Sequence, residues 1–359
     1  MELDRIAKLA TEMIADINSD EALTLYKHLE SGKMLRSKLV LSVVDSDEAY
    51  RLCAIIELIQ SASLLHDDVI DSSDLRRGKP SLNAQFGNKN AIMLGDILYS
   101  RAFFELSHFP KSIAQSLSKS VVELSVGELE DVNLEQSFNE YEEKYLSMIG
   151  HKSASLIAAS AECAALLKSE VELLNSKNMD TESSGQNGGI LDSTMAYHVE
   201  CAKNSSIESK NSLNKDVLLD TQYYKILDSS KDIHKLYYDY GFNLGMAFQI
   251  IDDILDITQD STKLGKPALS DFKSGKTTLP YIYLYHALPK EKQVWLKSLF
   301  KQDLNAKDAQ ELKDLLLDSP LQKAREKALE YGNKALHIAS MLNNQKLYAI
   351  IQAMIERDF

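Results

Sequence analysis

Apolar residues recur at intervals of three and four along most of the 359-residue chain, a spacing typical of amphipathic helices. Runs of alternating β-branched residues, which would indicate strands, are hard to find, and only six prolines and fourteen glycines interrupt the pattern. The sequence therefore predicts an all-α protein. The expected helices cover 1–17, 21–29, 37–44, a long helix from Asp45 or Ser46 to Asp71, 90–106, 112–133, 137–167, a helix that starts at a Ser229/Asp232 capping box and carries Asp252, and 279–359.

Two stretches depart from the helical spacing of apolar residues. Residues 175–189 are poor in apolar side chains and rich in turn-forming residues, which is typical of a loop or a disordered segment. Residues 262–276 form a second expected loop, rich in glycine and lysine. We therefore predict a single domain over 1–359, with a polar, partly disordered insertion at about 169–231 that a surface can tolerate.

Composition narrows the class of protein. The hydrophobic content of 44% is ample for a packed core, and the net charge of −13 argues against a general nucleic-acid binder and a polybasic membrane anchor. Cys53, Cys163 and Cys201 show no metal-binding spacing, and a sparse, odd count fits a reducing compartment. No run of 18 apolar residues occurs, and the acidic amphipathic start is unlike a secretory signal. A cytoplasmic protein without a transmembrane segment is expected.

The most informative stretch is 63–80, SLLHDDVIDSSDLRRGKP, at the end of an apolar helix. Asp67 and Asp71 are four residues apart and so share a helix face, where like charges repel by about 0.2–0.5 kcal/mol per pair. A cation would offset this repulsion, and carboxylate oxygens together with substrate phosphates suit Mg²⁺. Asp67, Asp68 and Asp71 are therefore candidate metal ligands.

The same spacing returns in 248–258, FQIIDDILDIT, again on an apolar helix. Asp252, Asp253 and Asp256 repeat the positions of the first three aspartates. A single cluster of this kind is more often a solvated acidic corner than a site. Two copies, each followed by basic residues, favour two facing clusters that hold several Mg²⁺ ions around one diphosphate.

Cationic side chains near these clusters are candidates for holding phosphates. A lysine taken alone is more often a solvated surface residue, and the adjacent Arg76 and Arg77 have a simpler alternative, pairing with Asp71 and Asp74. The candidates are Lys33, Arg36, Arg76, Arg77, Lys152, Lys266 and Lys276.

With these residues in view, the chain resembles the trans-polyprenyl diphosphate synthases, from about residue 32 to residue 280 apart from the insertion. The matching segments are Gly32-Lys33-x-x-Arg36, LLHDDVIDSSDLRRGKPS, Gly95-Asp96, Lys152-Ser153-Ala154, GMAFQIIDDILD and DFKSGKTTLPY. The resemblance implies an isoprenoid-synthase bundle of ten or more helices around a central apolar cavity. It also implies a homodimer, and a transient membrane contact for product release is expected; the net charge already argues against a nucleic-acid partner.

The resemblance implies a Mg²⁺-dependent reaction, with three ions per site. An allylic diphosphate, such as farnesyl diphosphate, ionises, and the double bond of isopentenyl diphosphate attacks the carbocation. All six aspartates would bind metal, and Asp67, Asp68, Asp71, Arg76, Lys152, Asp252, Asp253 and Lys266 would be catalytic. The allylic substrate would contact Arg76, Lys152, Ser153, Gln249 and Lys266; isopentenyl diphosphate would contact Lys33, Arg36, Gln60 and Arg77; Lys276 would help to close the site. Gln60 stands where the family usually has His, and Ser153 where it usually has Thr.

Two small residues bear on product length. Ala62 and Ser63 lie about one helical turn before Asp67, where large aromatic side chains would block a growing chain. Their small size favours a long product, near octaprenyl, for a quinone side chain. The side chain that stops the growing product would then lie deeper, at Phe103 or Phe104. The alternative is that small residues only let helices pack closely.

Three other functions remain open. A short-chain farnesyl or geranylgeranyl diphosphate synthase would be favoured by a bulky residue at position 62 or 63. A class I terpene cyclase normally lacks the second aspartate cluster and the Lys33/Arg36 site. A non-catalytic subunit of a heteromeric synthase, or a helical scaffold, would be expected to have lost one cluster.

Overall fold

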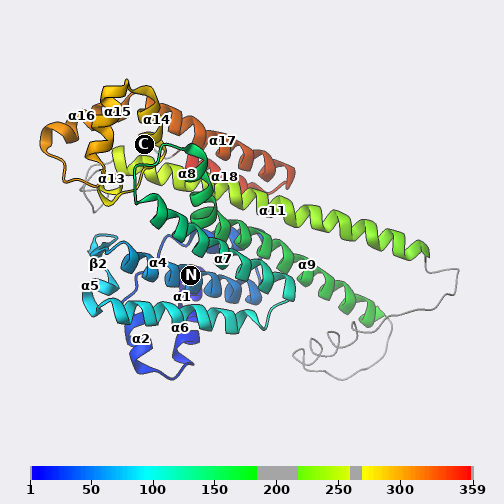
Figure 1. Ribbon diagram of the computed structural model, residues 1–359. Helices are drawn as coiled ribbons and strands as arrows, with labels where there is room; N and C mark the ends of the chain where they lie inside the picture. The colour runs from blue at the N-terminus through cyan, green and yellow to red at the C-terminus, as the bar shows by residue number, and fades with distance from the viewer. Residues whose placement is uncertain (1, 184–216, 259–268, 357–359) are drawn as a thin grey trace, which may run out of the picture. The chain divides into compact units, whose positions relative to one another are not determined.

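The computed structural model describes residues 2–183, 217–258 and 269–356 (Figure 1). Its contacts divide into two units, Met1–Leu167 with His234–Phe359, and Lys168–Ile233. The described site residues predicted above all belong to the first unit. Lys266 and Cys201 lie outside the described residues. The prediction of one domain with an insertion stays a prediction.

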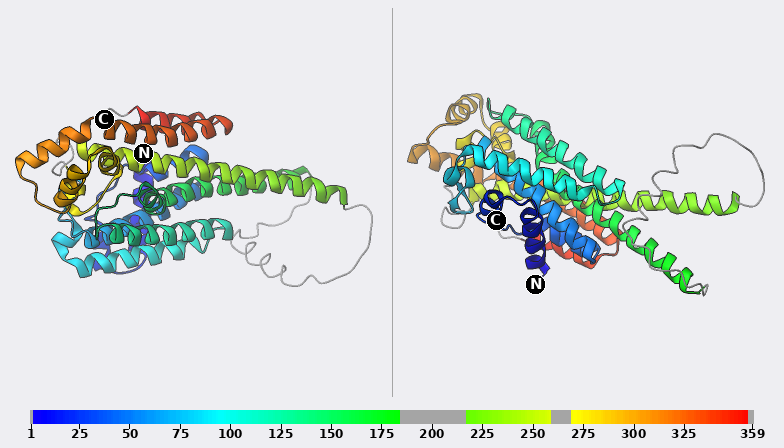
Figure 2. Two further views of the ribbon diagram at one scale, coloured as in Figure 1. Left: turned by 45° about the horizontal axis from the view of Figure 1, so that its top comes forward. Right: turned by 90° about the horizontal axis from the view of Figure 1, so that it is seen from below.

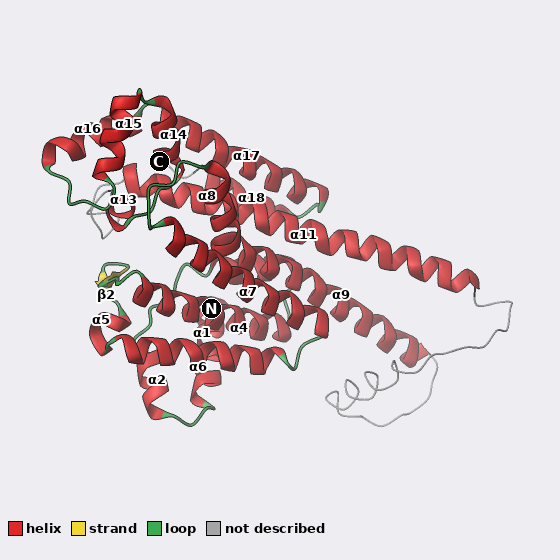
Figure 3. Cartoon of the chain, in the orientation of Figure 1, coloured by secondary structure: helices red, strands yellow, loops and turns green. Residues whose placement is uncertain are grey.

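The described chain is all-α, as predicted, with one pair of two-residue strands (Figure 3). The strands β1 (Leu75–Arg76) and β2 (Lys79–Pro80) form an antiparallel hairpin. The helices are α1 (Glu2–Ala15), α2 (Asp20–Tyr26), α3 (Leu35–Val43), α4 (Asp47–Ile70), α5 (Leu82–Phe86), α6 (Asn88–Leu106), α7 (Lys111–Leu134), α8 (Glu142–Ile149), the π-helical turn η1 (Gly150–Ala154), α9 (Ser155–Ser183), α11 (Val217–Thr258), α13 (Ser270–Ser274), α14 (Leu279–Ala287), α15 (Lys290–Leu299), α16 (Ala306–Leu317), α17 (Ser319–Met341) and α18 (Gln345–Ile355).

Local chemistry explains where α4 begins and ends. The Ser46 side chain accepts a hydrogen bond from the backbone N–H of Ala49, so of the two predicted N-caps, Asp45 and Ser46, the second is correct. Asp71 is the C-cap, and its N–H bonds the carbonyl of Asp67. The first aspartate cluster therefore occupies the last turn of a 24-residue helix, as the sequence predicted.

Several other predicted boundaries were wrong. The segment 137–167 is not one helix, because α8 begins only at Glu142 and η1 separates it from α9. Residues 175–183, predicted as loop, continue α9, since adding a turn to an existing helix costs far less than nucleating one. The helix α11 begins at Val217, not at the predicted capping box, because apolar residues already recur at helical spacing before Ser229.

The predicted glycine- and lysine-rich loop, 262–276, is helical in part. Residues 270–274 form the short helix α13, and residues 262–268 lie outside the described part of the chain. Among the residues that the structure describes, no helix is both long and apolar enough to cross a membrane.

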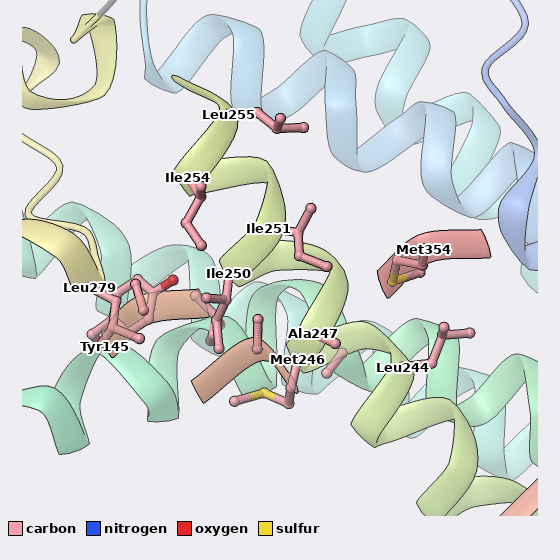
Figure 4. Packing of buried hydrophobic residues seen from close by; sticks show 14 of the residues in the cluster. Tyr145, Leu244, Met246, Ala247, Ile250, Ile251, Ile254, Leu255, Leu279 and Met354 are labelled. Carbon is pink, nitrogen blue, oxygen red and sulfur yellow. The ribbon is translucent and has the colours of Figure 1, made fainter. Parts of the chain in front are cut away.

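Two hydrophobic clusters hold the two aspartate-bearing helices. One surrounds α4 and includes Ile55, Ile59 and Ala62, which are fully buried. The helix α6 packs along α4, and the two helices lie side by side in Figures 1 and 2. The other cluster surrounds α11; Figure 4 shows Ile250 and Ile254 among its buried residues. Both aspartate clusters thus sit on helices whose apolar faces are locked in a core.

Close contact between backbones sets the position of α11. A Cβ atom on Gly241 would lie 2.7 Å from Cα of Ala158, and one on Gly245 would lie 2.6 Å from Cα of Ala154. Any larger side chain at these positions would push α11 away from η1 and the start of α9. The two glycines therefore fix the distance between the helix of the second aspartate cluster and the turn that carries Lys152.

We expect Gly241→Ala to lower the free energy of unfolding by about 1–3 kcal/mol, because the added methyl group meets backbone that cannot move aside. Gly332→Ala is the matched control, since its Cβ would meet side-chain atoms of Ile355 and Ile351 and no backbone atom of another segment. Urea unfolding of both variants measures the difference. Equal stability of the two variants would show that the α11 contact can relax.

Candidate active site

The end of α4 and the β1–β2 hairpin form a buried ion pair. The Arg76 guanidinium donates to both carboxylate oxygens of Asp68, with Nη2–Oδ1 at 2.7 Å and Nε–Oδ2 at 2.8 Å. Asp68 is only 3% exposed, so a bidentate partner is needed to offset its loss of water. The alternative pairing of Arg76 with Asp71 or Asp74 was wrong. The hairpin turns the chain back so that Arg76 reaches the aspartate eight residues before it.

Asp67 has the opposite environment. Burial, together with the negative charge of Glu128 on α7, raises the pKa of Asp67 to about 7, although Lys152 and Arg76 oppose the change. Glu128 is itself buried; its Oε1 has no hydrogen-bond partner, and its Oε2 pairs with the ammonium group of Lys152. Two carboxyl groups therefore lie near each other with incomplete compensation, an arrangement that favours a cation.

Lys152 lies in the π-helical turn η1, between α8 and α9. Its ammonium group is 2.6 Å from Oδ2 of Asp131 and 2.7 Å from Oε2 of Glu128, both on α7. π-Helical turns are rare and occur often at functional sites. A Cβ on Gly127 would lie 2.2 Å from the backbone nitrogen of Lys152, so a glycine is required for this approach.

Lys276, in the segment between α13 and α14, reaches the same region. Its ammonium group lies 2.9 Å from Oδ2 of Asp71, 3.5 Å from Oδ2 of Asp131 and 4.0 Å from Oε1 of Glu135. These contacts raise the pKa of Lys276 despite its burial. The segment that follows the second aspartate cluster is thereby tied to the first cluster.

The second aspartate cluster is held by hydrogen bonds. The hydroxyl of Tyr145 donates to Oδ2 of Asp253 at 2.6 Å, and Nε2 of Gln249 donates to Oδ1 at 2.8 Å. Burial raises the pKa of Asp253 well above its ordinary value. Asp256 is also buried and accepts from the hydroxyl of Ser270 at 2.8 Å, whereas Asp252 is exposed.

The two clusters belong to one connected region. The hydroxyl of Ser153 donates to Oε1 of Gln249 at 2.6 Å, and Gln249 in turn bonds Asp253. Lys152, the residue before Ser153, interacts electrostatically with Asp67. A short path therefore runs from the first cluster through Lys152, Ser153 and Gln249 to the second.

The remaining predicted cations lie around α3. Burial lowers the pKa of Arg36 to about 10, although the negative charge of Glu57 opposes this. Both Nε of Arg36 and Oε1 of Gln60 are buried without a hydrogen-bond partner. Arg77, at a φ of 55°, places its guanidinium against Gly32 and donates to the carbonyl of Glu30 at 2.8 Å. Lys33 is exposed.

The residues predicted to set product length are placed as follows. Ala62 is fully buried in the core around α4, and the hydroxyl of Ser63 donates to the carbonyl of Gln60 at 2.9 Å. On the neighbouring helix α6, Phe103 and Phe104 are 38% and 57% exposed.

Sequence reasoning missed several residues that interact with the predicted site, among them Glu57 on α4, Glu128 and Asp131 on α7, and Tyr145 on α8. The sequence held a signal for two of them, since Glu128 and Asp131 are three residues apart on a helix and Glu128 directly follows Gly127. Glu57 and Tyr145 carry no comparable signal, because a single polar group on an apolar helix is common.

The donor set fits a hard cation. In the described ranges, no group of three or more acidic, histidine or cysteine side chains is placed to hold a metal by itself. Mg²⁺ does not require such a cage, because it usually takes one or two carboxylates together with substrate phosphates and water. The partly buried Asp67 and the buried Glu128, whose charges are incompletely compensated, are consistent with such a cation.

Comparison with known proteins decides the family. The sequence model of the polyprenyl synthetase family matches residues 20–190 and 218–316. The chain belongs to the polyprenyl synthetase family. This confirms the resemblance and the isoprenoid-synthase fold, and makes the protein a member of a family of prenyltransferases.

Individual relatives agree with the family but differ in product. The octaprenyl pyrophosphate synthase structure from Helicobacter pylori is 38% identical, covers 99% of both chains and has a TM-score of 0.78. A prenyl transferase from Cyanidium caldarium is 35% identical over 72% of this chain, and the match spans 65% of that relative. A geranylgeranyl diphosphate synthase from Saccharolobus solfataricus is 28% identical over 85% of this chain and 78% of its own length.

The close contact between Gly127 and η1 is expected to matter for the rate of prenyl transfer. Gly127→Ala should lower kcat/KM by about tenfold to a hundredfold, because the methyl group displaces Lys152 from its place beside Asp67. Ser125→Ala, at an exposed position on the same helix, is the control. Steady-state assays with labelled isopentenyl diphosphate measure both, and an active Gly127→Ala enzyme would contradict the inferred role of this contact.

Proposed function

We propose that this protein is a Mg²⁺-dependent all-trans-polyprenyl diphosphate synthase, which adds isopentenyl diphosphate head to tail (1′–4) to an allylic diphosphate. The observation that carries the proposal is the path from Asp67 through Lys152, Ser153 and Gln249 to Asp253, which joins both aspartate clusters. A helical scaffold would have no reason to bury opposed charges in this way. Family membership supports the same conclusion.

The hard step is the separation of diphosphate from an allylic carbocation. The six aspartates would hold Mg²⁺, in three ions per site, and when bound these ions supply positive charge that makes diphosphate a better leaving group. Arg76, Lys152, Ser153, Gln249 and Lys266 would orient the allylic diphosphate. Lys276, from the segment after α13, would hold the site closed.

The second substrate would bind beside α3. Lys33, Arg36, Gln60 and Arg77 would hold the diphosphate of isopentenyl diphosphate, so that its double bond faces the carbocation. The unpartnered Nε of Arg36 and Oε1 of Gln60 support this role, since buried polar atoms without partners are expected where a ligand completes them. No side chain is assigned as the base that accepts the proton, and the released diphosphate is a chemically competent acceptor.

The product we propose is long, near octaprenyl, and serves as a quinone side chain. The small Ala62 and Ser63 and the likeness to the octaprenyl pyrophosphate synthase support this length. The likeness to geranylgeranyl diphosphate synthases supports a short-chain product as the second candidate.

We further propose a homodimer in the cytoplasm. Support for the dimer comes from large apolar side chains exposed on α6 and α7, and these are Phe103, Phe104, Val122, Val126 and Leu129. Support for a reducing compartment comes from Cys53 and Cys163, which are free and buried.

Incubation with Mg²⁺, farnesyl diphosphate and labelled isopentenyl diphosphate tests the activity. Label should appear in extended prenyl products, complete chelation of divalent ions should abolish it, and Asp67→Asn should lower kcat by about a hundredfold or more. Glu123→Gln, on the outer part of α7, is the charge-matched control. If the wild-type protein incorporates no label, it is a non-catalytic subunit or a scaffold.

Product analysis tests the chain-length assignment. Ala62→Tyr should shorten the dominant product by at least one isoprene unit, because the ring occupies about one helical turn below Asp67. Ala353→Tyr, at an exposed position on α18, should leave the product distribution unchanged. Since Ala62 is buried, thermal unfolding of the folded variant is measured in parallel. An unchanged product from a folded Ala62→Tyr enzyme would place the floor elsewhere.

A further inference from the structure

The acidic residue Asp131 has no role in the reaction proposed above, although it lies at the centre of the charged region. It projects from α7, is 5% exposed, and contacts the ammonium groups of Lys152 at 2.6 Å and Lys276 at 3.5 Å through the same oxygen, Oδ2. Burial raises the pKa of Asp131, but the two lysines outweigh burial and hold its pKa below the ordinary value. Asp131 is therefore a charged carboxylate shared by two cations.

The two lysines require such a partner. Both ammonium groups contact one oxygen of Asp131, so they are close enough to repel each other; the carboxylates nearby raise the pKa of Lys152, and the charge of Lys276 opposes that rise. They also come from different parts of the chain, Lys152 from η1 and Lys276 from the segment between α13 and α14. Without a carboxylate between them, repulsion would move the second segment away from α4 and α7.

Asp131 differs from the other carboxylates that contact these lysines. Asp71 contacts Lys276, but it belongs to the proposed metal set, and an oxygen that binds Mg²⁺ is a weaker partner for an ammonium group. Glu128 contacts Lys152 but lies beside the proposed ligand Asp67. Asp131 lies outside the proposed metal set, so its ion pair with Lys276 would remain if Asp71 bound a metal ion.

We propose that Asp131 is a positioning residue, which holds Lys152 and Lys276 side by side so that a diphosphate meets a preorganised pair of cations. This inference rests on the proposed function, because it assigns the two lysines to the diphosphate of the allylic substrate. It goes further because it names Asp131 as the group that keeps the Lys276 segment, between α13 and α14, in place before the substrate binds. Preorganised cations bind an anion more tightly, since they lose less freedom on binding.

Calorimetry with inorganic pyrophosphate and saturating Mg²⁺ tests the proposal on the full chain. Asp131→Asn should bind pyrophosphate about tenfold more weakly than the wild type, because the neutral amide no longer holds both ammonium groups. Glu130→Gln is the matched control, since it removes the same charge from the next position of α7, where Glu130 pairs with His151 rather than with a lysine. It should bind pyrophosphate as the wild type does.

Kinetics separate positioning from a structural role. In Asp131→Asn, the KM for the allylic diphosphate should rise about tenfold while the KM for isopentenyl diphosphate stays within twofold, because Asp131 pairs with the two lysines and the second substrate is proposed to bind beside α3. Asp131→Glu, which keeps the charge, should recover part of the affinity. If Asp131→Asn does not fold, intermediate pyrophosphate binding by Asp131→Glu carries the test.

Two results would overturn the proposal. Tighter pyrophosphate binding by Asp131→Asn would show that Asp131 only repels the anion, and equal losses in both KM values with a lower unfolding temperature would show a purely structural role. Failure of the proposed function is a separate outcome. A wild-type protein that binds pyrophosphate but incorporates no isopentenyl diphosphate would refute the synthase activity and leave the positioning role testable by calorimetry.

Discussion

The balance of buried charge is the constraint on which the rest of this structure depends. Carboxylates stand at the ends of two apolar helices, where leaving water is costly unless each charge finds a partner. Asp68 forms an ion pair with Arg76, and Asp131 forms ion pairs with two lysines. Asp253 accepts hydrogen bonds from Tyr145 and Gln249. Asp67 and Glu128 are compensated only in part. Most of the charges are thus paired, yet the site keeps an excess of negative charge where a divalent cation is expected.

Close backbone packing makes this balance possible. Gly127 lets η1 approach α7, and Gly241 and Gly245 let α11 approach η1 and α9. Each contact brings a charged or polar residue within reach of another helix, with Lys152 toward Asp131 and Ser153 toward Gln249. Because the helices are locked by their apolar faces in two cores, the short distances between site residues are set by rigid elements rather than by loops.

The same arrangement supports the proposed difference between the sites of the two diphosphates. The region around Lys152 and Lys276 combines cations with carboxylates that can take metal, which suits a diphosphate that must leave. Around Arg36 and Gln60, unpartnered donors and acceptors stand near one carboxylate, Glu57. That region suits a diphosphate that is held but not cleaved. The proposed division of the two substrates follows from this difference in charge.

Much of the fold and part of the site could be predicted from the sequence. Helical spacing of apolar residues predicted the all-α class, and Ser46 predicted the start of α4, because capping and periodicity are local properties. Predictions of helix boundaries were wrong where two local signals disagreed. At the start of α11, the helical spacing of apolar residues outweighed the capping box at Ser229.

The repeated aspartate spacing by itself determined the kind of chemistry, since residue type and spacing decide which ligands a helix face can present. Only the tertiary structure decided which cationic side chain forms an ion pair with which carboxylate. The pairing of Arg76 with Asp68, and of Lys152 and Lys276 with Asp131, depends on a hairpin, a π-helical turn and a glycine contact that bring distant segments together. Such pairings are set by distances between helices, and these distances are a property of packing that no local pattern contains.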